Sequence, residues 1–181
     1  MNRQNFSLEP FPAAGPLPSC QLTGSVTRRG DAVSIHYNLR GDLAALVMPA
    51  PAYLPARRHG LWEGTCFEFF LGVKGQPRYW EFNLSPAGLW NVYGFAGYRQ
   101  GMAEETAITS LPVGVQRRRD SLLLAVELEV DGIVAADQAL AVGMAAVIQL
   151  AGGGLTYWAL THGGPQPDFH RRDSFIVALP A

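Results

Sequence analysis

Hydrophobic and polar side chains alternate along much of the chain, as they do in β-strands that cover a core with one face. The alternation is clearest in residues 122–130, where Leu and Val occupy the even positions and Leu, Ala and Glu the odd ones. Residues 33–39 show the same period, with polar side chains between Val, Ile, Tyr and Leu. Both segments are therefore predicted to be half-buried strands.

Further apolar or alternating segments extend this pattern, and turn sequences rich in Gly and Pro separate them. These segments are residues 43–48, 66–73, 79–85, 89–95, 105–111, 113–118, 140–150, 157–161 and 175–179. Residues 131–137 fit one helical turn, and no segment has the period of a longer amphipathic helix. About ten strands with little helix predict an all-β fold, an antiparallel two-sheet β-sandwich of the jelly-roll-like kind.

Length and composition favour one domain over residues 1–181. The chain has 181 residues, of which 48% are hydrophobic, enough for a single core. Four prolines fall within residues 9–18. Because proline fixes its own backbone and disfavours helix before it, residues 1–18 are predicted to form an extended lead-in.

The charge and cysteine counts narrow the range of partners. Fourteen basic residues balance fifteen acidic ones, so we expect neither nucleic acid nor an anionic membrane as a partner. Two cysteines are too few for a disulfide framework, and Cys66 is expected to pack as a small apolar side chain.

The segment before Cys20 lacks the basic start and apolar core of a signal peptide, and no apolar run of about 18 residues occurs. A cytoplasmic protein is expected, and its oligomeric state stays open.

The segments 66–73 and 79–85 are predicted to form a hairpin with one apolar and one polar face. Alternation places one set of side chains in the core: Phe67, Phe69, Leu71, Trp80, Phe82 and Leu84. The opposite face carries Glu68, Tyr79, Glu81, Asn83 and Ser85. Charged groups resist burial, so this face is expected to be wet or to line a cleft.

Residues 61–102 contain three of the four tryptophans, close to the polar face of the hairpin. A flat aromatic ring can cover the apolar face of a sugar, while carboxylates and amides bind its hydroxyls. Trp62 is the candidate stacking ring, and Glu68, Glu81, Asn83 and Arg99 are candidate hydrogen-bonding partners. These residues fit equally well an ordinary core with solvated carboxylates.

Other functions stay open, including an interaction domain that uses an open sheet edge. Glu68 and Glu81 could be the two carboxylates of a hydrolase. An axial histidine with Met48, Met102 or Met144 could hold haem. A structural calcium ion is compatible with carboxylates near turns, although the chain has no Asp-rich loop.

The segments 61–62, 66–70, 79–83 and 98–99, with 157–158, 168–170 and 175–177, resemble the DOMON-like superfamily, and in particular its family-nine carbohydrate-binding modules. The resemblance runs from about residue 22 to 179. It implies a jelly-roll-like sandwich with a concave ligand face, on which two tryptophans clamp a sugar ring. Trp62 would be the first clamp residue and Trp158 the second. The resemblance therefore favours a non-catalytic protein that binds a small sugar. Haem is the alternative ligand, because other members of the superfamily bind haem.

Overall fold

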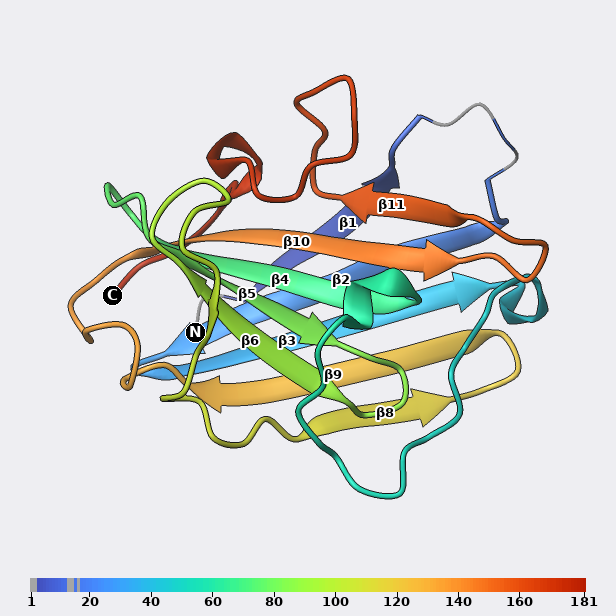
Figure 1. Cartoon of the computed structure of the whole chain (residues 1–181), viewed down its shortest axis with the longest axis horizontal. Helices are drawn as coiled ribbons and strands as arrows, with labels where there is room; N and C mark the ends of the chain where they lie inside the picture. The colour runs from blue at the N-terminus through green and yellow to red at the C-terminus, as the bar shows by residue number, and fades with distance from the viewer. Residues whose placement is uncertain (1–2, 13–14, 16) are drawn as a thin grey trace.

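The computed structural model describes residues 3–12, 15 and 17–181, and strands dominate it (Figure 1). The strands are β1 (Gln4–Pro10), β2 (Cys20–Arg29), β3 (Ala32–Gly41), β4 (Cys66–Val73), β5 (Tyr79–Leu84), β6 (Trp90–Phe95), β7 (Ala103–Glu104), β8 (Val113–Arg117), β9 (Ser121–Glu129), β10 (Leu140–Gln149), β11 (Leu155–Ala159) and β12 (Val177–Leu179). Three short 3-10 helices are η1 (Leu43–Ala45), η2 (Leu61–Glu63) and η3 (Arg172–Ser174). The all-β prediction is confirmed. The described residues form twelve strands where about ten were predicted.

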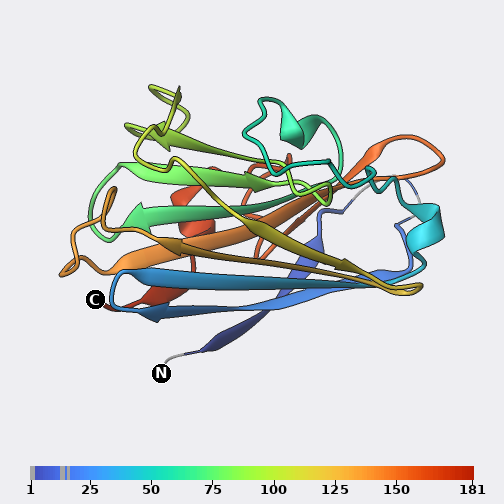
Figure 2. The same ribbon diagram turned by 90° about the horizontal axis from the view of Figure 1, so that it is seen from below.

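All strand pairs are antiparallel, and the strands form one continuous curled sheet in the order β7-β6-β5-β4-β10-β11-β1-β2-β3-β9-β8, with β12 on β10. The connection depends on β1, which pairs with β2 from Gln4 to Leu8 and with β11 through Glu9 and Pro10. The two halves of the sheet face each other (Figure 2). The sequence predicted two separate sheets, and the structure differs because β1 bonds to both halves.

The predicted extended lead-in at residues 1–18 contains β1, which the sequence pattern did not single out as a strand of the sheet. Phe6 and Leu8 alternate with polar residues and are buried, so this segment is a strand of the sheet. Residues 1–2, 13–14 and 16 of the predicted lead-in lie outside the described residues.

Two local predictions also differ from the structure. The apolar run 43–48 contains η1, which begins where the Asp42 side chain accepts a hydrogen bond from the Ala44 backbone N–H, 3.1 Å away. Residues 105–111 contain no strand. Residues 131–137 form turns, and the Val134 backbone N–H donates a 2.8 Å hydrogen bond to the Val130 oxygen, the spacing of one helical turn. Strand β2, which the sequence pattern did not single out, pairs with β3 along its whole length.

The core lies between the two halves of the sheet. The ring of Tyr37 on β3 lies 5.2 Å from that of Phe67 on β4, and its hydroxyl donates a 2.6 Å hydrogen bond to the backbone oxygen of Glu68. Phe69 and Phe82 are paired across β4 and β5, with stacked rings 4.3 Å apart. The predicted hairpin and its buried apolar face are confirmed, as is the burial of Cys66.

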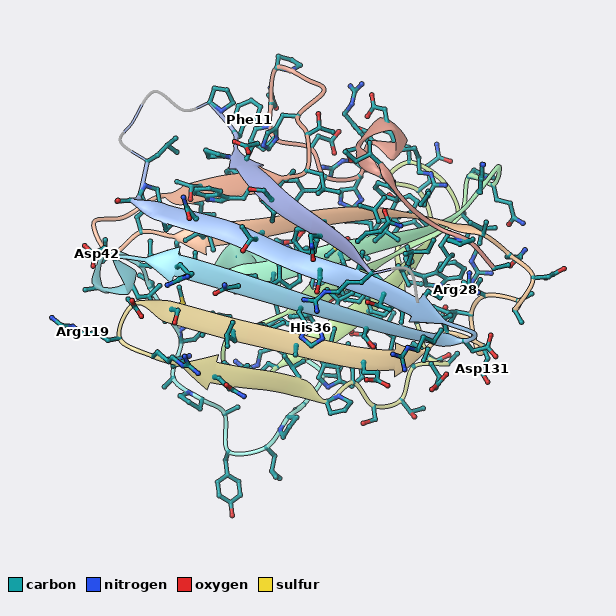
Figure 3. All side chains as sticks on the ribbon, turned by 180° about the vertical axis from the view of Figure 1, so that it is seen from behind. Phe11, Arg28, His36, Asp42, Arg119 and Asp131 are labelled. Atoms are coloured by element: carbon teal, nitrogen blue, oxygen red, sulfur yellow. The ribbon has the colours of Figure 1, made fainter. Side chains whose placement is uncertain are left out.

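The outer face of the half formed by β2, β3, β9 and β8 is polar. His36, for example, is exposed on this face (Figure 3). The helices among residues 3–12, 15 and 17–181 are all too short for a membrane crossing. The outer face of the other half is different, because loop residues and strand residues together line a pocket there.

Candidate functional site

A pocket of about 530 Å³ lies on the outer face of β5, β4, β10 and β11. Strand alternation turns Glu81, Glu68, Val147 and Tyr157 outward, one from each of these neighbouring strands, and the loops before β4, after β6 and after β11 complete the walls. The lining residues are Trp62, Glu63, Glu68, Glu81, Phe95, Arg99, Met102, Val147, Leu155, Tyr157, Pro167, Phe169 and His170.

Glu68 and Glu81 form the floor of the pocket. In the register of β4 and β5, Glu68 is opposite Asn83 and Glu81 is opposite Phe70, so the two glutamates are diagonal neighbours on one face. Glu68 is only 3% exposed and Glu81 only 5%. The sequence left open whether this face is wet or lines a cleft, and the structure shows a pocket floor with little exposure.

Asn83 lies beside Glu81 on the same face of β5 and bonds to its carboxyl group. It is fully buried, and its Nδ2 atom donates a 2.8 Å hydrogen bond to Glu81 Oε1. Its Oδ1 atom lies 3.5 Å from Cys66 Sγ. Asn83 was predicted to bind ligand hydroxyls, but it is buried and does not line the pocket, and both ends of its amide contact protein groups.

Burial changes the protonation of the glutamate pair. It raises the pKa of Glu68 well above its ordinary value, and the neighbouring charge of Glu81 raises this pKa further. Burial also raises the pKa of Glu81, against the opposing effects of the Asn83 hydrogen bond and the Arg99 charge. The pair therefore holds protons to higher pH than exposed glutamates do.

His170 covers one side of the carboxyl pair. Its Nδ1 atom is 2.8 Å from the hydroxyl oxygen of Tyr79, and its Nε2 atom is 3.7 Å from Glu81 Oε2. Burial first, and then the charge of Arg99, lower the pKa of His170 to about 4. The imidazole is consequently neutral near pH 7 and does not neutralise Glu81.

Arg99 lies at the rim, where it joins two loops. Its Nη2 atom donates a 2.9 Å hydrogen bond to Asp168 Oδ1, and the hydroxyl of Tyr98 donates to the other oxygen of the same carboxylate. Its backbone N–H donates to the Tyr79 hydroxyl at 3.2 Å, and its φ of 53° is in the left-handed region. Arg99, a candidate hydrogen-bonding residue from the sequence, lines the pocket, and its guanidinium is bound to Asp168.

Trp62 and Trp158 do not face each other across the pocket. Trp62, on η2, is half-buried and lines the pocket, with Tyr93 at 5.7 Å between ring centroids. Trp158 is 3% exposed in the core, where its Nε1 atom donates to Thr156 Oγ1 at 3.0 Å. The prediction of Trp158 as a second stacking ring was wrong because the period of β11 turns it inward.

The aromatic residue that β11 presents to the pocket is the preceding one, Tyr157. Its ring lies 6.2 Å from that of Phe169, which also lines the pocket. Sequence reasoning missed both, together with His170 as a site residue. Alternation in β11 was the available signal for Tyr157. Phe169 and His170 lie in a loop without such a period, and only the resemblance of segment 168–170 pointed to them.

Replacement of Glu68 by glutamine is expected to make stability less dependent on pH. A carboxyl pKa that is raised by folding stabilises the protein below the unfolded pKa, and this contribution is lost as pH rises through the folded pKa. Relative to Glu68→Gln, the thermal midpoint of the parent protein should therefore fall as pH rises above about 4.3. Thermal unfolding monitored from pH 4 to 9 measures the difference.

Glu127→Gln is the matched control, since Glu127 is exposed on β9 in the other half of the sheet. Its pH profile should follow that of the parent protein. Superimposable profiles for Glu68→Gln and the parent would mean that Glu68 titrates as an exposed carboxyl does.

Among residues 3–12, 15 and 17–181, no group of three His, Cys, Asp or Glu side chains is arranged to hold a metal ion. Fold and site together define an antiparallel β-protein whose outer sheet face bears a pocket, with aromatic walls and a floor of two carboxyl groups.

Comparison with solved structures places the fold among β-proteins of known architecture. A protein of Bacteroides uniformis, named as a candidate carbohydrate-binding protein, superposes with a TM-score of 0.69 at 15% identity, over 96% of this chain and 84% of its own. This likeness shows the fold. Two structures of a family 9 carbohydrate-binding module of Caldicellulosiruptor kristjanssonii, with glucose and with cellotriose, give TM-scores of 0.49 at 7% identity. They cover 79% of this chain and 68% and 67% of their own.

Neither a protein-family model nor a curated protein sequence matches the chain.

Proposed function

We propose that the chain is a non-catalytic carbohydrate-binding protein whose ligand, a small sugar, occupies the pocket on the outer face of β4, β5, β10 and β11. The observation that carries the proposal is the combination of aromatic side chains with buried carboxyl groups in one pocket of about 530 Å³. Such a volume suits a small ligand. The candidate carbohydrate-binding protein that shares the fold adds support.

The roles follow from chemistry and position. Trp62 and Tyr157 would cover the apolar C–H faces of the sugar ring. Glu68 and Glu81 would bind hydroxyl groups from below, and Asn83 would keep Glu81 in place through its 2.8 Å hydrogen bond. Arg99 would contribute from the rim while bound to Asp168.

Several finer assignments belong to the same proposal. We place the chain in the DOMON-like superfamily and in the cytoplasm, and we interpret the two facing halves of the sheet as a jelly-roll-like sandwich. The near-neutral net charge of −1 agrees with a small ligand and with the absence of nucleic acid as a partner.

Calorimetric titration with a panel of mono- and disaccharides tests the proposal. We expect saturable heat from at least one sugar, with one molecule bound per chain. Absence of heat from every member of the panel would overturn the proposal.

Hydrolysis is a second candidate, because Glu68 and Glu81 are adjacent and both have raised pKa values. A hydrolase would release product from a chromogenic glycoside, and the release would stop in the Glu68→Gln/Glu81→Gln double variant. In a binding protein, incubation would leave the glycoside intact.

Haem is kept as a third candidate, since His170 and Met102 both line the pocket. Both imidazole nitrogens of His170 already face protein groups, Tyr79 and Glu81. Haem titration followed by absorbance decides this point, because a Soret shift is expected only if the iron gains a protein ligand.

A further inference from the structure

The floor of the pocket has hydrogen-bond acceptors that the protein does not use. Glu68 Oε1 is buried and has no hydrogen-bond partner among the described residues. Glu81 Oε2 lies 3.7 Å from His170 Nε2, which is longer than a hydrogen bond. Glu63 adds a third carboxylate to the pocket wall. Buried acceptors without donors are costly, so a ligand that supplies donors at this point would be bound favourably.

The positive charge of Arg99 is felt at the floor, where burial raises the pKa of Glu81 and this charge lowers it, but Asp168 offsets part of the charge. The guanidinium of Arg99 is held by Asp168 at 2.9 Å. His170, whose pKa is about 4, carries no charge near pH 7. The pocket consequently combines the carboxyl groups of Glu63, Glu68 and Glu81 with aromatic walls. Ionised carboxylates and aromatic faces both attract cations.

We propose that the pocket selects an amino sugar, whose protonated amine sits against the carboxyl groups of Glu68 and Glu81. The choice of a sugar rests on the proposed function, whereas the choice of an amine rests on the pocket floor. An ammonium group offers three donors and no acceptor, so it matches a pair of acceptor groups more completely than a hydroxyl does. Trp62 and Tyr157 would contact the ring and add cation–π attraction.

Amine binding is coupled to deprotonation of the carboxyl pair. The titratable and charged groups around the pair are Tyr37, Glu63, Cys66, Tyr79, Tyr93, Arg99, Asp168 and His170. The tyrosines and the cysteine have raised pKa values and stay neutral, as does His170 near pH 7. A cation stabilises the ionised form of the pair, so amine affinity should rise from pH 5 to 7 with release of up to roughly one proton.

The test compares glucosamine with glucose and N-acetylglucosamine by calorimetry at pH 7. The three share a ring, but only glucosamine carries a positive charge. We expect glucosamine to bind at least about tenfold more tightly than the other two, a ratio typical of one additional charged contact. Its binding heat should differ between phosphate and Tris buffers because protons are released.

Glu68→Gln should reduce this preference to within about twofold, because the amide keeps the shape of the side chain and removes its charge. Glu127→Gln, on the other half of the sheet, should retain the full preference. A preference for glucosamine that survives Glu68→Gln would overturn the inference.

The remaining outcomes separate this inference from the proposed function. Glucose binding as tightly as glucosamine would overturn the inference and leave sugar binding standing. If no sugar binds but cyclohexylamine binds in a Glu68-dependent manner, the amine part is supported and the carbohydrate part is overturned. If neither the sugars nor cyclohexylamine bind, both proposals fail.

Discussion

Replacing Phe82 by alanine is expected to lower the free energy of unfolding by about 3–5 kcal/mol, the usual cost of truncating a buried aromatic ring. Phe82 is fully buried on β5, and its ring stacks on Phe69 of β4 at 4.3 Å with an interplanar angle of 9°. Removing the ring loses this contact and leaves a cavity between the two halves of the sheet. Equilibrium unfolding in urea measures the change.

Tyr53→Ala is the matched control, because Tyr53 is 98% exposed and its truncation removes an aromatic ring without opening a cavity. Its effect should stay within about 0.5 kcal/mol of the parent protein. Equal effects of the two substitutions would contradict the assignment of Phe82 to the core. Because β5 also carries Glu81, a loss of core packing at Phe82 would loosen the floor of the pocket as well.

Replacing Trp62 by alanine is expected to weaken sugar binding by about 1–3 kcal/mol, because a stacking ring contributes both apolar area and specific contact. Trp62 is half-buried on η2 at the pocket wall, with edge contacts to His59 at 5.1 Å and Tyr93 at 5.7 Å. Calorimetric titration of the variant, with the sugar that binds the parent protein most tightly, measures the loss.

Tyr53→Ala again provides the control, since it removes an exposed aromatic ring that does not line the pocket. Its affinity should equal that of the parent protein. Unchanged affinity in a folded Trp62→Ala protein would place the ligand away from Trp62, and the roles assigned to the pocket would then be wrong.

Alternation within single strands was sufficient to predict the hairpin of β4 and β5 and its two faces. Phe69 and Phe82 were assigned to the core, and Glu68 and Glu81 to the opposite face, from sequence spacing alone. Such a prediction needs only local information, because successive side chains of a strand point to opposite sides. The same rule, had it been applied to β11, would have placed Tyr157 outward.

Long-range contacts could not be predicted in this way. Strand β1 joins the two halves of the sheet through pairing with β11, about 150 residues further along the chain. His170 reaches the carboxyl pair only because its loop folds back onto Tyr79, 91 residues away in sequence. Loop residues such as Arg99 and His170 line the pocket together with Glu68, so the raised pKa values of the glutamate pair could not be predicted from local sequence patterns.

The central claim is that the pocket beside Trp62 binds a sugar, and the indole N–H signals of the four tryptophans test it directly. Trp80, Trp90 and Trp158 are buried in the core, whereas Trp62 lines the pocket. In a ¹H–¹⁵N NMR titration with the binding sugar, only the indole signal that disappears in Trp62→Phe should move progressively to saturation. A titration in which that signal stays fixed while the protein binds the sugar would contradict the account.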